Sequence, residues 1–298
     1  MTDHMEQTFT VPPAADGRKL KTFLQKNAQM SASFRKHLKW NGEILRNGEP
    51  LRNANALLSA GDVITCRWNE KTPIIPAVIP LTVIYEDKYL LAVGKPAGML
   101  IHPTGYETRQ TLVNAVAGYY RKTGQNAGIH PVYRIDRDTT GLVLIAKTAQ
   151  GQYLLTRSHD CIYREYLALV SGRLTPETGL IEAPIGRDPA GHSRFYVTPD
   201  GKTAQTEYTT IRTYPDYSLV RFHLLTGRTH QIRVHCAHLD HPLLGDTLYG
   251  GNTDKISRQA LHARSLRCQH PVTGEILTLT APVPDDMQRL IDVSDGSI

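Results

Sequence analysis

The sequence predicts an α+β protein in two unequal parts. Its 298 residues are long for one domain and suit two. A proline-rich segment at 71–80 separates a short basic region from a longer one. In the longer region, hairpin patterns such as Val83–Val93 alternate with helical patterns such as Thr111–Lys122. We therefore expect a small module at 1–70, an extended linker at 71–80 and a larger domain at 81–298.

Net charge and cysteine usage narrow the class of protein. The formal charge of +6 and the isoelectric point near 9.1 suit a protein that meets polyanions, and they favour nucleic acid over acidic small molecules. The four cysteines lie far apart, so neither a disulfide framework nor a zinc knuckle is indicated. The sequence has no secretory leader pattern and no apolar run of membrane-spanning length, so we expect a cytoplasmic protein.

Positive charge is concentrated near the N-terminus. Residues 17–42 hold seven basic side chains and no acidic one. Leu20, Phe23 and Leu24 at helical spacing, and then Phe34 and Leu38, predict two short amphipathic helices. We expect the second helix to be capped by Ser31 or Ser33, and strands and turns to follow as far as Trp68. A solvated basic face on a small helical cap is the alternative interpretation.

Residues 15–68 resemble the S-four-like RNA-binding module first known from a ribosomal protein of the small subunit. The resemblance rests on the basic helix pair, the turn at Asn47–Pro50 and the stretch Gly61–Ile64. It implies that the basic helix faces bind RNA. The residues implied in RNA binding are Lys19, Lys26, Arg35, Lys36 and Lys39.

A charged loop lies directly before a strand with core character. Leu142–Ala146 is an unbroken apolar run typical of a strand buried on both faces, and Gly141 permits a tight turn into it. Asp136, flanked by Arg134 and Arg137, must therefore lie close to the core. An acid held ionised by nearby positive charge suits a nucleophile or base. The alternative is an ordinary surface turn rich in Arg and Asp.

This loop and strand resemble the catalytic signature of the RluA-type pseudouridine synthases. The match runs from Tyr133 to Lys147, against a family pattern of His-Arg-Leu-Asp-Arg-(Asp/Glu)-Thr-Ser-Gly followed by Leu-(Leu/Val)-Leu-(Phe/Ile)-Ala-Lys. The resemblance implies that Asp136 is the essential nucleophile and that Arg134 enters the RNA stack. Tyr133 departs from the pattern, since it stands where the family has His.

Two later motifs also resemble this family. Residues 164–172 follow its Lys-x-Tyr-x-Ala-x-Val-x-Gly pattern with Arg164 in the first position, which implies that Tyr166 stacks on the target base. A tyrosine half-buried in a strand is the alternative. Residues 225–235 match Thr-Gly-Arg-(Thr/Ser)-His-Gln-(Ile/Leu)-Arg-Val-His within a predicted helix, which implies that Arg233 pairs with Asp136. The Leu-His-Ala motif implies that Leu261 packs beside the tyrosine, although it also suits plain core.

Four histidines near this helix invite a metal interpretation, which we do not favour. Their spacing does not assemble a closed ligand set, and no His-Glu-x-x-His motif is present. We expect no metal and no cofactor. The four residues are His230, His235, His238 and His241.

The resemblance implies a mixed, mainly antiparallel sheet and the isomerisation of uridine to pseudouridine in RNA. Ribosomal RNA is the favoured partner, transfer RNA is the alternative substrate, and we expect a monomer that contacts no membrane. Asp136 would attack C1′, remove a C2′ proton or add to C6 of the base, and the sequence does not choose among these routes.

Two other functions fit parts of the sequence. Asp136, Asp138 and Thr140 resemble the Asp-x-Asp-x-Thr loop of haloacid-dehalogenase-type phosphotransferases, but that loop follows an apolar strand and needs acidic metal ligands downstream. The second alternative is a non-catalytic RNA-binding or ribosome-assembly factor. Loss of the nucleophile would mark such a factor, and Asp136 is present.

Overall fold

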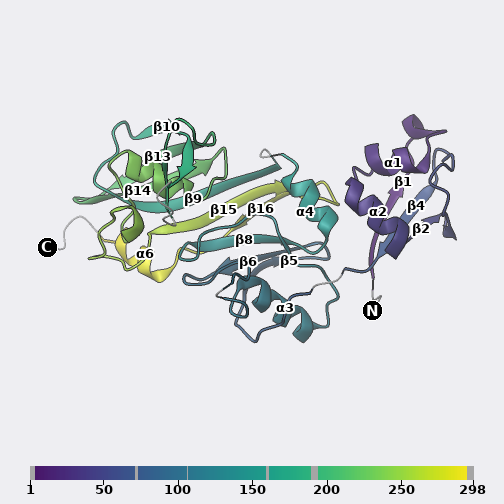
Figure 1. Ribbon diagram of the computed structural model, residues 1–298, viewed down its shortest axis with the longest axis horizontal. Helices are drawn as coiled ribbons and strands as arrows, with labels where there is room; N and C mark the ends of the chain where they lie inside the picture. The colour runs from purple at the N-terminus through teal and green to yellow at the C-terminus, as the bar shows by residue number, and fades with distance from the viewer. Residues whose placement is uncertain (1–3, 71–72, 106, 159–160, 189–193, 294–298) are drawn as a thin grey trace.

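The computed structural model describes residues 4–70, 73–105, 107–158, 161–188 and 194–293. In these residues a four-stranded sheet near the N-terminus stands beside a ten-stranded sheet, and a two-stranded ribbon completes the fold. Figure 1 shows the small sheet at one end of the large one and helix α6 (Asp285–Ile291) toward the opposite end. The prediction of an α+β protein with a mixed, mainly antiparallel sheet is confirmed.

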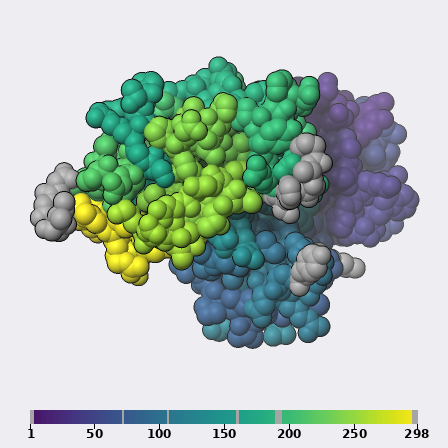
Figure 2. All heavy atoms as spheres, turned by 60° about the vertical axis from the view of Figure 1, so that its left-hand side comes forward, coloured from purple at the N-terminus to yellow at the C-terminus, as the bar shows by residue number. Residues whose placement is uncertain are grey.

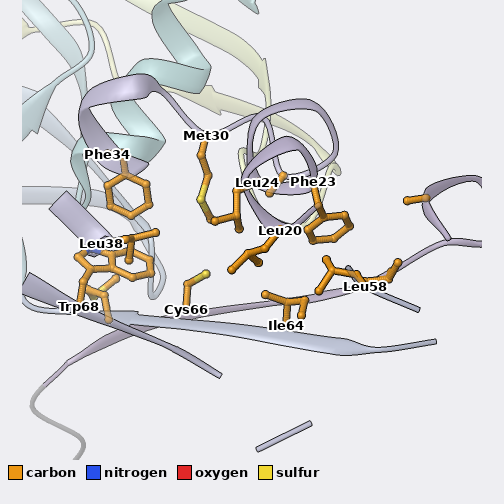
Figure 3. Close-up of a cluster of buried hydrophobic side chains, with 14 residues drawn as sticks. Leu20, Phe23, Leu24, Met30, Phe34, Leu38, Leu58, Ile64, Cys66 and Trp68 are labelled. Carbon is orange, nitrogen blue, oxygen red and sulfur yellow. The ribbon is translucent and has the colours of Figure 1, made fainter. Parts of the chain in front are cut away.

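The N-terminal module, residues 4–70, has its own core. Its strands follow the order β1-β4-β2-β3, and two helices cover one face (Figure 1). Apolar side chains from both helices meet the sheet around Ile64 and Cys66, both fully buried (Figure 3). Ser31 caps α2 by accepting a hydrogen bond from Phe34 N at 3.1 Å, as its position in the sequence predicts. The elements are β1 Met5–Thr10, η1 Pro13–Ala15, α1 Leu20–Lys26, α2 Ala32–Asn41, β2 Gly42–Arg46, β3 Glu49–Pro50 and β4 Val63–Trp68.

The strand β1 was not anticipated from the sequence. It pairs with β4 along its whole length, from Met5 opposite Trp68 to Thr10 opposite Val63. The segment is mostly polar, so its own pattern carries little strand signal. The partner strand decides its conformation, which is a tertiary effect.

The segment after the module runs extended along helix α3 (Leu112–Thr123). Residues 73–80 adopt no regular structure, as their prolines predict, and residues 71–72 of the expected linker lie outside the described part. Asn114 Nδ2 donates to Ile75 O at 2.7 Å, and Ala77 N donates to Asn114 O at 3.0 Å. The connection is therefore anchored to the helix.

The large sheet has the order β10-β13-β14-β9-β15-β8-β6-β5, with β16 paired to β15 and β7 paired to β8. Within the described residues, β15 and β8 are the one parallel pair, at His262–Thr140 and Ala263–Gly141. The strands are β5 Thr82–Glu86, β6 Leu90–Lys95, β7 His130–Pro131, β8 Thr140–Ala146, β9 Ile162–Ser171, β10 Thr178–Glu182, β13 Gln205–Thr213, β14 Tyr217–Leu224, β15 Leu261–Gln269 and β16 Ile276–Thr280. The ribbon pairs β11 Ile185–Arg187 with β12 Phe195–Val197.

Helices pack on this sheet through their apolar faces. Thr111 begins α3 with a capping box, and the helix packs against β6 and β8 around Val143. Thr148 caps α4 by accepting from Gly151 N at 2.9 Å. Helix α5 packs through Ile232 on the part of the sheet that contains β9 and β14. The remaining helices are α4 Ala149–Thr156, α5 Gln231–His238, η3 Thr247–Tyr249 and α6 Asp285–Ile291.

One glycine sets the close approach at the centre of the sheet. Gly141 has φ +109°, and a Cβ there would lie 2.3 Å from Ala263 O, so only glycine fits between β8 and β15. The residues just before β8 form the loop 132–139. This loop is therefore fixed at one end to the most central strands.

The N-terminal module contacts the larger domain through α4 and through Tyr89, which directly precedes β6. Ser31 N donates to Gln150 Oε1 at 3.1 Å, and Gln150 Nε2 returns a bond to Gln29 O at 3.0 Å. Tyr89 Oη donates to Glu6 O at 3.2 Å. The purple N-terminal atoms accordingly form a lobe against the body in Figure 2. None of the helices in the described ranges has the length and apolar character to cross a bilayer.

Candidate active site

A cleft of about 650 Å³ opens beside the loop 132–139. This loop, the segment Leu100–Thr104, the start of β9 and the turn before α5 form its walls. Arg134, Asp136 and Tyr166 all line it. The cleft therefore brings together three motifs that lie far apart in the sequence.

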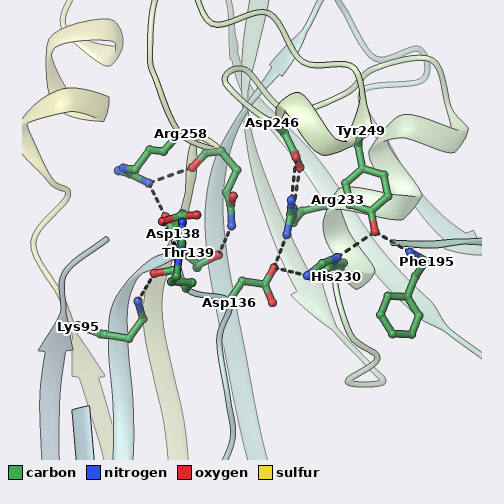
Figure 4. A network of polar contacts seen from close by, with 12 residues as sticks. Lys95, Asp136, Asp138, Thr139, Phe195, His230, Arg233, Asp246, Tyr249 and Arg258 are labelled. Atoms are coloured by element: carbon green, nitrogen blue, oxygen red, sulfur yellow. Dashed lines mark hydrogen bonds and ion pairs between the residues drawn. The ribbon is translucent and has the colours of Figure 1, made fainter. Parts of the chain in front are cut away.

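Asp136 is held by an arginine that a second acid fixes in place. Arg233 Nη1 donates to Asp136 Oδ2 at 3.0 Å, and its Nε and Nη2 donate to the carboxylate of Asp246 at 2.7 and 2.8 Å (Figure 4). The Arg233 and Asp246 side chains are 7% and 1% exposed, whereas Asp136 is 23% exposed. Burial alone would lower the pKa of Arg233, but Asp246 and then Asp136 outweigh burial and raise it. A charged, immobile guanidinium thus sets the direction of the Asp136 carboxylate.

His230 approaches the same carboxylate oxygen from α5. Its Nε2 lies 3.9 Å from Asp136 Oδ2, and its Nδ1 lies 2.9 Å from Tyr249 Oη. The Tyr249 oxygen accepts a bond from Phe195 N at 3.0 Å, so its hydroxyl hydrogen is available to Nδ1. We therefore assign the neutral ring with its proton on Nε2, toward Asp136. Burial lowers the pKa of His230 and favours this neutral form. The Asp136 charge raises the pKa, and the Arg233 charge offsets part of that rise.

Two buried cations hold the backbone of the loop. The Lys95 ammonium, on a side chain that is 2% exposed, donates to Arg137 O at 2.7 Å and to two carbonyls of the turn after β6. From the other side Arg258 Nη1 donates to Asp138 O at 3.2 Å. The carboxylate of Asp286, in α6, fixes Arg258 through bonds of 2.7 and 2.8 Å. Helix α6 thus supports, through Arg258, the loop that carries Asp136.

A side-chain amide completes this support. Gln259 Nε2 donates to Thr139 Oγ1 at 3.2 Å, and Thr139 N donates to Asp136 O at 3.2 Å, so the loop closes on itself.

Burial lowers the pKa of Lys95 to about 7, against the opposing charges of Asp138 and Asp136. The Asp136 carboxylate therefore stands on a rigid, hydrogen-bonded loop, an arrangement suited to nucleophilic or acid–base chemistry.

A family model described as RNA pseudouridylate synthase matches residues 89–238, which span the loop, β9 and α5. The chain belongs to this family. This membership makes the protein an isomerase of uridine in RNA. It agrees with the family resemblance of the motifs in the loop 132–139, in β9 and in α5.

Curated relatives and solved structures agree with this membership. The chain is 37% identical to the uncharacterized RNA pseudouridine synthase YjbO of Bacillus subtilis, over 85% of the chain and 92% of that protein. It is 38% identical to the ribosomal large subunit pseudouridine synthase D of Vibrio cholerae, over 97% and 95%. The structure of human RNA pseudouridylate synthase domain containing 1 covers 69% of the chain and 84% of its own, with a TM-score of 0.57 and 26% identity.

Tyr166 and Leu261 lie together beside Asp136. Tyr166, in β9, is 4% exposed and packs in one apolar cluster with Leu261 and Ile232. A second, small hollow beside the cleft is lined by these three side chains together with Asp136. Burial raises the pKa of Tyr166, so the phenol stays neutral and offers an apolar face rather than a base.

Arg134 occupies a different position from the buried arginine. Its side chain is exposed at the mouth of the cleft, two residues before Asp136. Burial lowers the pKa of His102, on the facing wall, and the Arg134 charge lowers it further. An exposed cation here faces an incoming polyanion.

The five basic residues named in the N-terminal module do not line the cleft. Four of them are exposed on the helices or at their ends: Lys19, Lys26, Lys36 and Lys39. Arg35 differs because it is half-buried and donates to Met30 O at 2.5 Å. The structure therefore separates them from Asp136 and leaves the four lysines available to a partner.

The histidines near α5 each serve separate contacts. His235 lies between Thr206 Oγ1 and Ala183 O, both at 2.9 Å, and His241 Nδ1 lies 2.8 Å from Ser171 O. In the part of the chain that the structure describes, no three or more His, Cys, Asp and Glu side chains are grouped to hold a metal ion.

Several residues of the site were missed by sequence reasoning. Asp246 and Tyr249 follow α5, and no local pattern in the sequence assigns either of them a role. Lys95 lies in the Gly-Lys-Pro-Ala-Gly stretch, where it reads as a turn residue. A buried acid opposite an arginine is a signal that appears only when the fold brings the two segments together.

Proposed function

We propose that this protein isomerises uridine to pseudouridine in ribosomal RNA, with Asp136 as the nucleophile. The observation that supports this most strongly is the asymmetry of the carboxylate. Both Arg233 and His230 approach Oδ2, and in the described part of the chain no bond is made to Oδ1. Oδ2 is thereby the anchoring oxygen and Oδ1 the oxygen available to the substrate.

The reaction needs a carboxylate but no external reagent. The N1–C1′ bond breaks, the uracil ring turns, C5 bonds to C1′, and the C5 proton is lost while N1 gains one. Asp136 supports each of the three routes, attack at C1′, removal of the C2′ proton or addition at C6, since all use one carboxylate oxygen. Arg233 stabilises the carboxylate whenever it leaves the substrate as an anion.

The target base must leave the RNA stack to reach Asp136. The Tyr166 ring and Leu261 supply an apolar wall for the uracil, and Arg134 at the mouth is placed to fill the gap left in the stack. Stacking of a base on an aromatic ring contributes roughly 1–3 kcal/mol.

Ribosomal RNA is favoured over transfer RNA by the names of the relatives. The similar proteins of Vibrio cholerae and Escherichia coli are named ribosomal large subunit pseudouridine synthase D. The exposed basic face of α1 and α2 supports binding of a structured polyanion. A groove of about 1070 Å³, which Gln29, Arg157 and Arg267 help to line, extends between this module and the sheet. We propose that the module supplies affinity and the larger domain the chemistry.

Mapping of pseudouridine in total RNA from a deletion strain tests this proposal. One or more ribosomal positions should lose the modification, and a plasmid with the wild-type gene should restore them while Asp136→Asn should not. A plasmid with Asp138→Asn is the matched control, because the Asp138 carboxylate lies two residues away on the same loop and pairs at 3.5 Å with the exposed Arg137 rather than with Arg233. Loss confined to transfer RNA would replace the substrate assignment, and an unchanged map would refute it.

A further inference from the structure

Arg164 also lines the cleft, and its surroundings differ from those of Arg233. It lies in β9 two residues before Tyr166, so both side chains project from the same face of the strand, about 6.6 Å apart along it. Both line the cleft with Asp136. The positive charge of Arg164 also reaches the tyrosine, because it opposes the rise in the pKa of Tyr166 that burial causes.

Arg164 is held by an aromatic ring. Its guanidinium carbon lies 5.5 Å from the centre of the Tyr133 ring. The Tyr133 hydroxyl donates to Leu142 O at 3.0 Å, which fixes the ring to β8. A planar guanidinium stacks on such a ring and keeps its edge free for bidentate hydrogen bonds.

Both positions also differ from the family patterns that the sequence resembles. Tyr133 replaces a histidine, Arg164 replaces a lysine, and the structure brings the two replacements into contact. An aromatic ring and a guanidinium form a stacked pair that lysine forms less well. The two changes therefore constitute one feature of this chain.

The guanidinium has no anionic partner in the described residues. Arg164 Nε is buried without a hydrogen-bond partner, and no carboxylate of these residues lies within 4.0 Å of its nitrogens. The neighbouring Glu165 pairs instead with Arg221, at 3.8 Å. A cation that lines the cleft and has no anionic partner among the described residues is placed to pair with an anion of the substrate.

We propose that Arg164, held by Tyr133, binds a phosphate of the RNA backbone next to the uridine that is isomerised. The proposal rests on the proposed function, because it takes the cleft as the place where the base is received. A phosphate supplies the negative charge that the protein does not provide, and its oxygens match the arginine edge. The neutral uracil ring would leave the Arg164 charge without an anionic partner.

Binding of a ribosomal RNA fragment tests this inference, with Asp136→Asn as the background so that the RNA stays unreacted. Arg164→Met should weaken binding about tenfold or more. It should also reduce the slope of log affinity against log salt by about 0.7. Arg221→Met removes the same charge outside the cleft and should change affinity less than threefold. Melting temperature should not fall in Arg164→Met, because the substitution removes a buried donor that has no partner.

Neutral phosphates locate the contact. Each RNA fragment carries a single methylphosphonate, a neutral analogue of the phosphate, at one of the positions that flank the target uridine. The control RNA carries the same 2′-O-methyl group and an ordinary phosphate at that position. At one position the replacement should weaken binding by the Arg164-containing protein about tenfold, and by Arg164→Met less than twofold. Equal losses in both proteins at every position, or unchanged affinity of Arg164→Met for unmodified RNA, would overturn the inference. Pseudouridine formation by the wild-type protein tests the proposed function separately, because this comparison needs no turnover.

Discussion

The cleft and the N-terminal module use positive charge in opposite ways. In the cleft, the Arg233 side chain is 7% exposed and bonds to two acids. In the module, Lys26, Lys36 and Lys39 are exposed on short helices. The buried charge can hold only one geometry, whereas the exposed charges remain hydrated and mobile.

This difference in burial separates residues that position Asp136 from residues that add to the affinity for RNA. A buried guanidinium with fixed partners orients Asp136 before any RNA arrives, so its value is realised in the chemical step. Exposed lysines release counterions from a polyanion and add to binding without fixing geometry. Substitutions in the cleft should therefore have large effects on turnover or folding, and those in the module small effects on salt-dependent affinity.

The largest effect among the supporting residues is expected at Arg233. Arg233→Met should lower the single-turnover rate about 10²–10³-fold, as for loss of a preorganised donor. It should also reduce the free energy of unfolding by about 3–5 kcal/mol, since Asp246 is left buried and unpaired. Rapid-quench kinetics and urea denaturation measure the two effects.

A double variant separates these two effects of Arg233. Arg233→Met with Asp246→Leu should recover much of the stability, because no charge is left uncompensated, but none of the activity. Recovery of both would show that the pair only supports the fold.

The next effect is a loss of stability in acid at His262, which lies behind the cleft. Burial lowers the pKa of His262 to about 4 from an ordinary 6.5, and its Nδ1 lies 2.9 Å from Thr140 Oγ1. The unfolded chain binds this proton near pH 6.5 and the folded chain only near pH 4. Stability from this residue is thus complete above pH 6.5 and falls by about 3 kcal/mol as the pH drops to 4.

Urea denaturation at a series of pH values measures this effect. The slope of the free energy of unfolding against pH, between pH 4 and 6.5, should become shallower in His262→Gln. It should persist in His238→Gln, an exposed histidine of α5. A full slope in His262→Gln would assign the acid sensitivity to other groups.

A smaller effect is expected at Tyr249, which orients His230. Tyr249→Phe removes a hydrogen bond to Nδ1 and should slow turnover about fivefold, equivalent to about 1 kcal/mol. The acid limb of the rate profile should move as well, because the histidine proton is no longer confined to Nε2. Equal rates and identical pH profiles would show that Tyr249 has no part in placing His230.

The smallest effects are expected in the module. Lys36→Gln and Lys39→Gln should each reduce the salt slope of log affinity by about 0.7–0.9, with the rate at saturating RNA unchanged. Arg35→Gln should reduce it less, because that side chain already donates to Met30 O. Lys122→Gln, an exposed lysine at the end of α3, is the matched control. Unaltered slopes would assign RNA affinity to another surface.

Local patterns were sufficient to predict most of the elements. The apolar run before Lys147 gave β8, and Thr111 and Thr148 mark the starts of α3 and α4 where the structure has them. Capping and periodicity act within a few residues, so the sequence displays them directly. The strand β1 was not predicted, because its conformation depends on pairing with β4, which is distant in the sequence.

The site was predictable only in part, for a related reason. Motifs single out Asp136 and Arg233, which the structure places 3.0 Å apart, but nothing local in the sequence joins Asp246 to Arg233 or Asp286 to Arg258. Such pairs are made when the chain folds loops and the C-terminal helix around the cleft. A short polar segment gives no indication of which charge it will meet.

The most direct test of this account compares two neighbouring acids in one measurement. Asp136→Asn and Asp138→Asn are assayed for single-turnover release of the C5 hydrogen from a ribosomal RNA fragment labelled in its uridines. The account predicts a loss of about a thousandfold or more for Asp136→Asn, with RNA affinity and melting temperature nearly unchanged, and at most about tenfold for Asp138→Asn. Turnover by Asp136→Asn close to the wild-type rate, or a larger loss in Asp138→Asn, would contradict it.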